Sequence, residues 1–78
     1  MEEDIKKPKH YKLNGLDIES IDIVKAVSSE YEGVNAFYIG NILKYLIRSK
    51  KKNGLEDLKK ARVYIDWLIE SLEREDIE

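Results

Sequence analysis

From residue 18 onward, apolar residues recur every three or four positions, which is the spacing of one face of an α-helix. Two glycine-containing breaks, Glu32-Gly33 and Asn53-Gly54, divide this pattern into three segments. The chain contains no alternating apolar and polar run of useful length and no internal repeat. The sequence therefore predicts a small all-α domain of three helices.

We expect these helices over residues 18–31, 36–50 and 55–73. Asp17 and Asn35 are the expected N-caps of the first two, because their side chains can accept hydrogen bonds from the free N–H groups of a first turn. Asn53 and Glu56 have capping-box spacing before the third helix. Gly40 lies inside the second helix, where glycine is unfavourable, and predicts the close approach of another segment.

The first residues have a different character from the rest of the chain. Pro8 disfavours helix before it, and Asn14-Gly15 is a turn dipeptide. We therefore expect an irregular N-terminal arm over residues 1–16, followed by one helical domain over residues 17–78.

The size of the chain favours self-association. A domain of 78 residues buries only about 60% of its unfolded surface. The sequence has no cysteine, so neither a disulfide nor a thiolate metal site can reinforce the fold. Val63 and Trp67 lie off the centre of the third apolar stripe and suggest a second packing surface. We expect a homo-oligomer, and the alternative is a monomeric bundle in which Trp67 lies at the edge of the core.

Composition excludes several classes of protein. With 42% apolar residues and a net charge of −2, the chain is too hydrophobic to be disordered and is not a polyelectrolyte. No apolar run approaches the roughly 20 residues of a membrane span, and the acidic N-terminus lacks the apolar region of a signal peptide. We expect a cytoplasmic protein with no membrane partner.

The charges are unevenly distributed along the chain. Between Lys44 and Arg62, eight basic residues and two acids give a net charge of +6. From Asp66 to Glu78, six acids and one arginine give a net charge of −5. The basic stretch surrounds the predicted start of the third helix, where free N–H groups favour anions. This combination predicts a site for phosphate.

A set of polar side chains defines the predicted site more closely. Asn41, Lys44 and Arg48 are three and four residues apart, so they share one face of the second helix. Arg48 can bind two phosphate oxygens, and Asn41 can contact a base edge or a hydroxyl. Tyr45, like Tyr11 in the arm, can stack on a base. Lys60 adds a further cation.

Two acidic residues have alternative interpretations. Glu56 and Asp57 can orient the basic side chains, bind a ribose hydroxyl or hold a metal bound to phosphate, although Glu56 is first of all a candidate cap. The three lysines at 50–52 fit a solvated helix end better than a binding site. His10, the only histidine, would by itself be read as a surface residue.

Several common catalytic patterns are missing. The sequence has neither the G-x-x-x-x-G-K-[ST] phosphate loop nor G-x-G-x-x-G. It has no Ser/His/Asp or Cys/His set and no histidine cluster for zinc. An ordinary single-chain kinase is therefore difficult to accommodate in this length.

Three fragments together resemble a family of small bacteriophage and prophage proteins. They are His10-Tyr11 with the segment at 18–23, the segment Gly40-Asn41-Ile42-Leu43-Lys44-Tyr45-Leu46-Ile47-Arg48, and the segment at 52–61. The family is described as nucleotide-kinase-like, because one larger phage relative is a nucleoside monophosphate kinase without the usual phosphate loop. The resemblance implies a location in the cytoplasm of an infected bacterium. It also implies a polar signature, formed by His10, Tyr11, Asn41, Lys44, Tyr45, Arg48, Glu56, Asp57 and Lys60.

Three functions are compatible with these observations. The first is a nucleotide-binding protein without chemistry, which would sequester a host nucleotide or a nucleotide immune signal and would need no cofactor. The second is a nucleoside monophosphate kinase-like phosphotransferase or its accessory subunit, in which Lys44, Arg48 and Lys60 stabilise charge and the acids hold Mg²⁺. The third is a nucleic-acid or protein-binding adaptor, against which the acidic overall charge argues. We expect binding without catalysis, with a phosphate-bearing small molecule as the partner.

Overall fold

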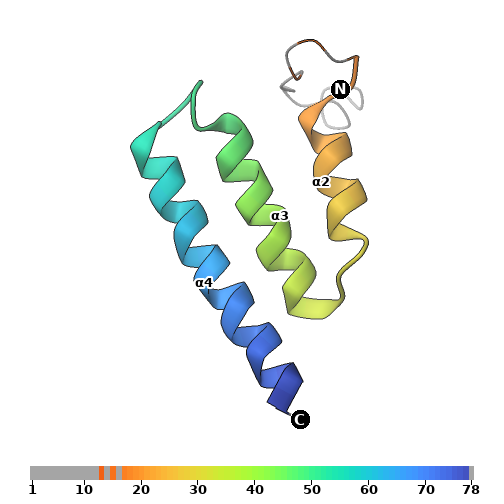
Figure 1. Ribbon diagram of the computed structural model, residues 1–78. Helices are drawn as coiled ribbons and strands as arrows, with labels where there is room; N and C mark the ends of the chain where they lie inside the picture. The colour runs from red at the N-terminus through yellow and green to blue at the C-terminus, as the bar shows by residue number, and fades with distance from the viewer. Residues whose placement is uncertain (1–12, 14, 16, 78) are drawn as a thin grey trace, which may run out of the picture.

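The computed structural model describes residues 13, 15 and 17–77, and the regular structure in this part of the chain is three α-helices. They are α2 (Ser20–Ser28), α3 (Gly33–Arg48) and α4 (Leu55–Ile77) (Figure 1). The prediction of a small all-α domain is therefore confirmed. None of these helices is both long and apolar enough to cross a membrane.

The first helix is shorter than predicted, and its cap is a different residue. Glu19, and not Asp17, is the N-cap of α2, and its backbone N–H donates to the Asp22 carboxylate at 3.1 Å. The Asp22 backbone N–H donates to the Glu19 carbonyl at 2.9 Å in return. The prediction of Asp17 placed the cap two residues too early, because it overlooked the reciprocal bond that Asp22 can make. The helix ends at Ser28 and does not reach Tyr31.

The second helix begins earlier than predicted, at Gly33, with Glu32 as its N-cap. Gly33 has a φ of +58°, the left-handed conformation that glycine adopts readily. Asn35 is buried in the first turn of α3 and is not a cap. Its side-chain amide instead donates to the Glu75 carboxylate of α4 at 2.9 Å. This hydrogen bond anchors the part of α4 that lies beyond residue 73, where the sequence predicted the end of the helix.

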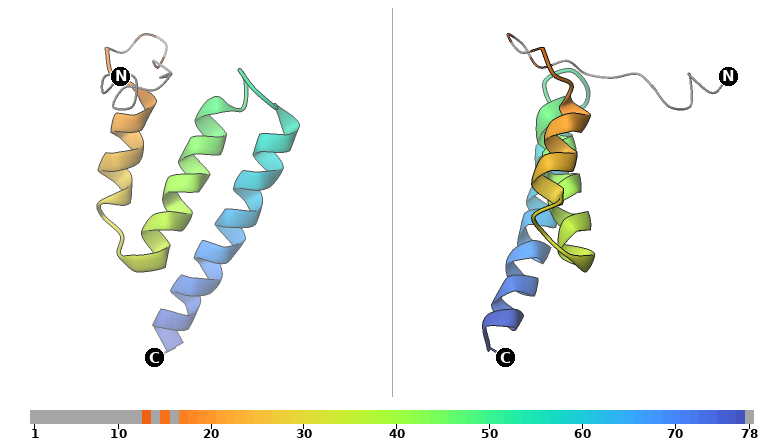
Figure 2. Two further views of the ribbon diagram at one scale, coloured as in Figure 1. Left: turned by 180° about the vertical axis from the view of Figure 1, so that it is seen from behind. Right: turned by 90° about the vertical axis from the view of Figure 1, so that its right-hand side faces the viewer.

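The three helices form a single layer with α3 in the middle (Figure 2). Helix α3 packs against both of its neighbours, whereas no Cα atom of α2 lies within 8 Å of one in α4. Among the described residues, the buried apolar side chains are only Ile42, Ala61 and Leu68. The core is therefore a seam between α3 and α4 and not the centre of a closed bundle.

Gly40 marks the point where α2 crosses close to α3. A Cβ atom added there would lie 3.3 Å from the Ser28 hydroxyl oxygen and 3.8 Å from a methyl carbon of Val24. The predicted close approach at Gly40 is confirmed, and its partners are side chains of α2. Since α3 is the only described helix on which α2 packs, this contact is central to how α2 is held.

We expect Gly40→Leu to separate α2 from α3. Overpacking of this kind costs about 1–3 kcal/mol, more than the gain of about 1 kcal/mol from replacing glycine within a helix. Ala26→Leu, on the exposed side of α2, is the matched control and should leave stability nearly unchanged. Urea unfolding followed by circular dichroism measures both. Equal stability of the two variants would contradict the assigned role of Gly40.

Candidate functional site

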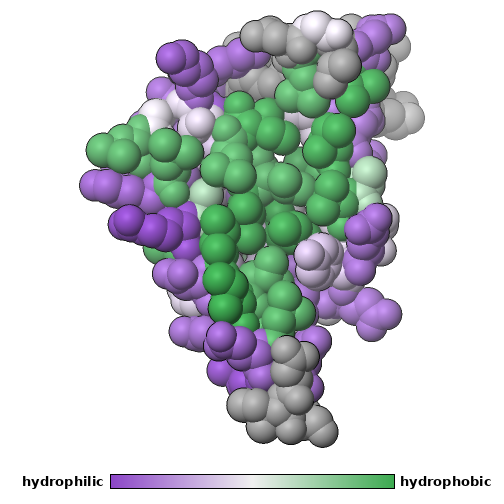
Figure 3. Space-filling model, viewed as in Figure 1, coloured by the Kyte–Doolittle hydropathy of each residue, from purple (hydrophilic) through white to green (hydrophobic). Residues whose placement is uncertain are grey.

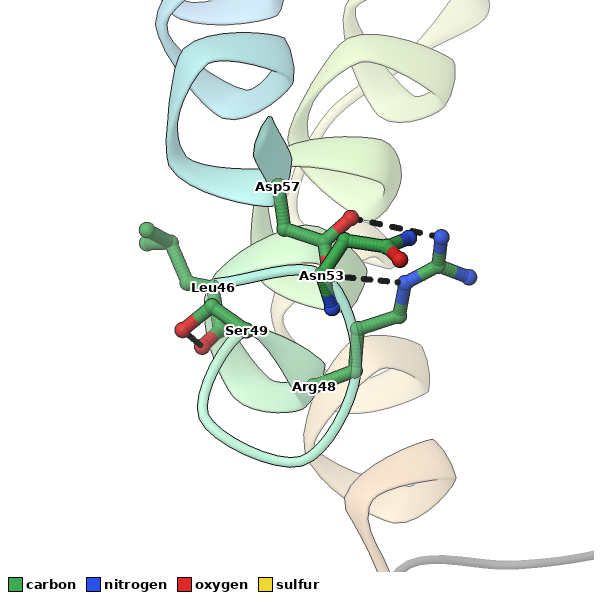
Figure 4. Close-up of polar contacts among 5 residues, drawn as sticks. All are labelled: Leu46, Arg48, Ser49, Asn53 and Asp57. Carbon is green, nitrogen blue, oxygen red and sulfur yellow. Dashed lines mark hydrogen bonds and ion pairs between the residues drawn. The ribbon is translucent and has the colours of Figure 1, made fainter. Parts of the chain in front are cut away.

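An ion pair between the half-buried Arg48 and the buried Asp57 joins the end of α3 to the start of α4. The Arg48 Nε and Nη2 atoms donate to the two Asp57 carboxylate oxygens, both at 3.3 Å (Figure 4). The Asp57 side chain is 0% exposed and that of Arg48 is 28% exposed. This fork geometry fixes the guanidinium plane as well as its position.

Asp57 also closes the turn that precedes α4. The backbone N–H of Asn53 donates to its Oδ2 atom at 3.2 Å. The capping residue is therefore Asp57, and the prediction that Glu56 would cap α4 is wrong by one position. Burial raises the pKa of Asp57, but the hydrogen bonds from Arg48 and the Asn53 N–H, together with the Arg48 charge, outweigh it, so the pKa lies below its ordinary value of 3.8. The carboxylate is thus an internal anion at the positive end of α4.

Three cations surround the ring of Tyr45. The Lys44 Nζ and Arg48 Cζ atoms each lie 5.0 Å from the ring centroid, and the Lys60 Nζ atom lies 5.6 Å from it. Lys44 and Arg48 come from α3 and Lys60 comes from α4. Cations within about 6 Å of an aromatic centroid are attracted to the ring. The structure therefore brings together four of the predicted site residues, three cations and the tyrosine ring that they share.

The ring of Tyr45 is the first of a row of aromatic rings. It stacks on Tyr64 with a centroid distance of 6.0 Å and an interplanar angle of 18°. Tyr64 contacts Trp67 at 5.3 Å and Phe37 at 5.9 Å, and Tyr38 lies 6.0 Å from Trp67. Of these five aromatic residues, only Tyr45 was among the predicted site residues. Together the five form what we call the aromatic row: Phe37, Tyr38, Tyr45, Tyr64 and Trp67.

The other predicted site residues make no contact with the ring of Tyr45 among the described residues, or lie outside that part of the chain. The Asn41 side-chain amide donates to the Phe37 carbonyl at 2.9 Å, a bond within its own helix. Glu56 is exposed at the start of α4. His10 and Tyr11 lie outside the residues that the structure describes. Lys50, Lys51 and Lys52 are exposed in the turn, as expected for a solvated helix end.

The ion pair predicts a pH dependence of stability. A carboxylate whose folded pKa is depressed stabilises the fold above its unfolded pKa, and that contribution is lost as pH falls through the folded value. We expect wild type to lose stability below about pH 4 by an amount that Asp57→Asn does not show. Arg48→Met should also remove this acid-dependent component, since it leaves the carboxylate buried without its cation. Urea unfolding between pH 2 and 7 measures the effect, and identical profiles for all three proteins would contradict it.

Comparison with known proteins places these features in a family. The model of the family described as protein of unknown function DUF3310 matches residues 5–66. The nucleotide kinase gp1.7 of Escherichia phage T7 is 39% identical over 72 residues, which are 92% of this chain and 36% of the relative. The gene 1.7 protein of Enterobacteria phage T3 is 40% identical in an alignment 65 residues long, which covers 78% of this chain and 39% of the relative.

The chain thus spans less than two fifths of the length of either relative. No solved structure matches it. The family model covers the whole of α2 and α3 and the half of α4 that carries Asp57, Lys60 and Tyr64. On this evidence the chain belongs to the DUF3310 family.

Proposed function

We propose that the chain binds a nucleotide on the α3–α4 face, at the cations around Tyr45. The observation that carries this proposal is the convergence of Lys44, Arg48 and Lys60 on one ring from two helices. Each of these side chains is long and could extend into water, so their gathering at a single point is informative. Asp57 offsets one of the three charges, and an added anion would offset the others.

The two lysines are the principal phosphate ligands in this proposal. Lys44 is exposed and Lys60 is half-buried. Within the part of the chain that the structure describes, each contacts the ring of Tyr45 and neither is paired with an acidic side chain. Ammonium groups bind phosphate as compact charges with three donors each. Arg48 has a different role, because its guanidinium group already donates to both Asp57 oxygens and is held over Tyr45 by this pairing.

The aromatic row supplies a surface for the base. A nucleobase can stack on tyrosine or tryptophan, with a gain of about 1–3 kcal/mol per base. Phe37 and Trp67 are 56% and 45% exposed, so the row remains open to solvent at that end. A ligand with a flat ring and a charged group fits a surface in which rings and cations are adjacent.

The family relationship supports a second candidate, transfer of phosphate between nucleotides, because the T7 relative is named a nucleotide kinase. In this alternative Lys44 and Lys60 would stabilise the charge on the transferred group. A shared magnesium site formed by Glu56 and Asp57 is poorly supported, because both Asp57 oxygens accept bonds from Arg48. Sequestration of a nucleotide without turnover needs no such site, and we favour it.

Nucleotide binding should be visible as a thermal shift. A ligand at a hundred times its dissociation constant stabilises a protein by about 2.7 kcal/mol, which should raise the melting temperature of so small a domain by more than about 5 °C. We expect this with nucleoside mono- and triphosphates and a much smaller shift with inorganic phosphate. Base stacking should also change the emission of Trp67, the only tryptophan, through its contact with Tyr64.

Lys60→Glu should weaken nucleotide binding by about 10–100-fold, because charge-assisted hydrogen bonds contribute about 1.5–3 kcal/mol. Lys59→Glu makes the same charge change one residue away, at an exposed position without a contact to Tyr45, and should reduce affinity only slightly. Titration calorimetry measures both. Equal loss in the two variants would show general electrostatic attraction and would overturn the assignment of the site.

Turnover separates the two candidates. We expect no diphosphate product when the chain is incubated with a nucleoside monophosphate, ATP and Mg²⁺ under conditions where binding is measurable. Product formation that is lost in Lys60→Glu would favour phosphate transfer. Product formation that survives this change would indicate either a contaminating kinase or a different site.

A further inference from the structure

The layer of helices has two unlike faces. Its contact seam runs along Ile42, Ala61 and Leu68, and the aromatic row and its cations lie to one side of that seam. On the other side, helical spacing aligns large aliphatic residues along each helix. We call this set the apolar face: Ile23 and Val27 of α2, Ile39, Leu43 and Leu46 of α3, and Leu58, Ile65, Ile69 and Leu72 of α4.

The apolar face is continuous across all three helices. Figure 3 shows it as an unbroken hydrophobic surface that extends over α4, α3 and α2, with hydrophilic residues at its margins. Leu46, Leu58 and Ile69 are 43%, 45% and 47% exposed. Single exposed apolar residues are common on protein surfaces, but contiguous patches of more than a few hundred square ångströms mark interaction sites.

The area of this face matches that of a stable interface. With 16 residues at about 1.5 Å each, α3 is about 24 Å long. Three helices about 9 Å apart make a layer about 27 Å wide, so the face has a footprint of about 650 Å² before the relief of its side chains is counted. Stable interfaces bury about 800 Å² of accessible surface on each partner. A partner that covers the whole face would therefore bind with a normal interface.

We propose that a second copy of the chain covers this face, so that two layers pack face to face in a six-helix dimer. A single layer buries only three apolar side chains among its described residues, and a second identical layer would supply the missing half of a two-layer core. An isologous contact needs only that the patch complements itself, and a flat aliphatic face does so without specific polar partners.

Charge favours an end-for-end arrangement of the two layers. Residues 44–62 carry a net charge of +6 at the turn end of the α3–α4 hairpin, whereas residues 66–77 of α4 carry −4 toward its other end. When α4 of one copy lies antiparallel to α4 of the other, each basic end faces an acidic one. A parallel pairing would set the basic end against only three acids near the start of α2 (Asp17, Glu19 and Asp22), and would bring the acidic end of α4 near Glu30 and Glu32.

This dimer leaves the proposed nucleotide site free. The aromatic row lies on the opposite side of the layer, so each copy would carry its own site on an outer surface. Dimerisation and nucleotide binding are therefore separable. A failure of one of these two proposals leaves the other intact.

The mass in solution tests the interface. We expect sedimentation equilibrium at about 50 μM protein to give twice the 9.2 kDa chain mass for wild type and a single chain mass for Ile69→Glu. Val63→Glu is the matched control, because Val63 is on the same helix and is 44% exposed. It lies four residues from Trp67, on the side of α4 away from the apolar face, so this variant should remain dimeric. Circular dichroism must show that the variants are helical, and Leu58→Glu provides a second disruption if Ile69→Glu does not fold.

A wild-type chain that is monomeric in solution would overturn the proposal, even if the monomer bound lipid vesicles through its apolar face. A dimer that persisted in both Ile69→Glu and Leu58→Glu would also overturn it, as would a dimer that dissociated in Val63→Glu. The absence of cysteine allows the direction to be tested with single introduced thiols. Energy transfer between copies labelled at Lys50→Cys and Glu70→Cys should exceed that between two copies labelled at Lys50→Cys, and the reverse order would overturn the end-for-end arrangement.

Discussion

The hairpin of α3 and α4 depends on the pairing of Arg48 with Asp57. An unpaired charge in this position would be strongly unfavourable, because the carboxylate has no access to water. The guanidinium fork and the Asn53 N–H satisfy it, and in doing so they hold the end of α3 and the turn against the start of α4. The same fork places Arg48 over Tyr45. One electrostatic contact therefore shapes both the fold and the surface on which the lysines meet.

The register of this hairpin explains why residues distant in sequence meet. Arg48 lies four residues before Lys52, and Asp57 lies four residues after Asn53. The same offset is seven for Tyr45 and Lys60, and fourteen for Tyr38 and Trp67. In two antiparallel helices joined by a short turn, residues at equal distances from the turn come to lie opposite one another. The contacts within these three pairs follow this rule. The aromatic row is thus a consequence of the turn position and of where tyrosine and tryptophan occur on either side of it.

This rule also shows what the sequence could and could not reveal. Apolar spacing was sufficient to predict three helices, and the position of Gly40 predicted a close contact. The caps were harder to assign, because Asp17, Asn35 and Glu56 are all good capping residues, and tertiary contacts decide which carboxylate or amide is used. Counting outward from the turn would have paired Arg48 with Asp57 and Tyr38 with Trp67. The open layer could not be foreseen, because helical periodicity identifies an apolar side but not whether a third helix folds over it.

Among the described helices, α2 is attached to α3 alone, and this has a consequence for the dynamics of the chain. A helix of nine residues that contacts only one of the other described helices can detach without disturbing the α3–α4 seam. Its amide protons should therefore exchange with solvent through local opening, earlier than those near Ile42 or Ala61. Each such event would uncover the flank of α3 that bears Gly40. The chain then behaves as a two-helix unit with a detachable third helix, and its exchange protection should decline from α4 toward α2.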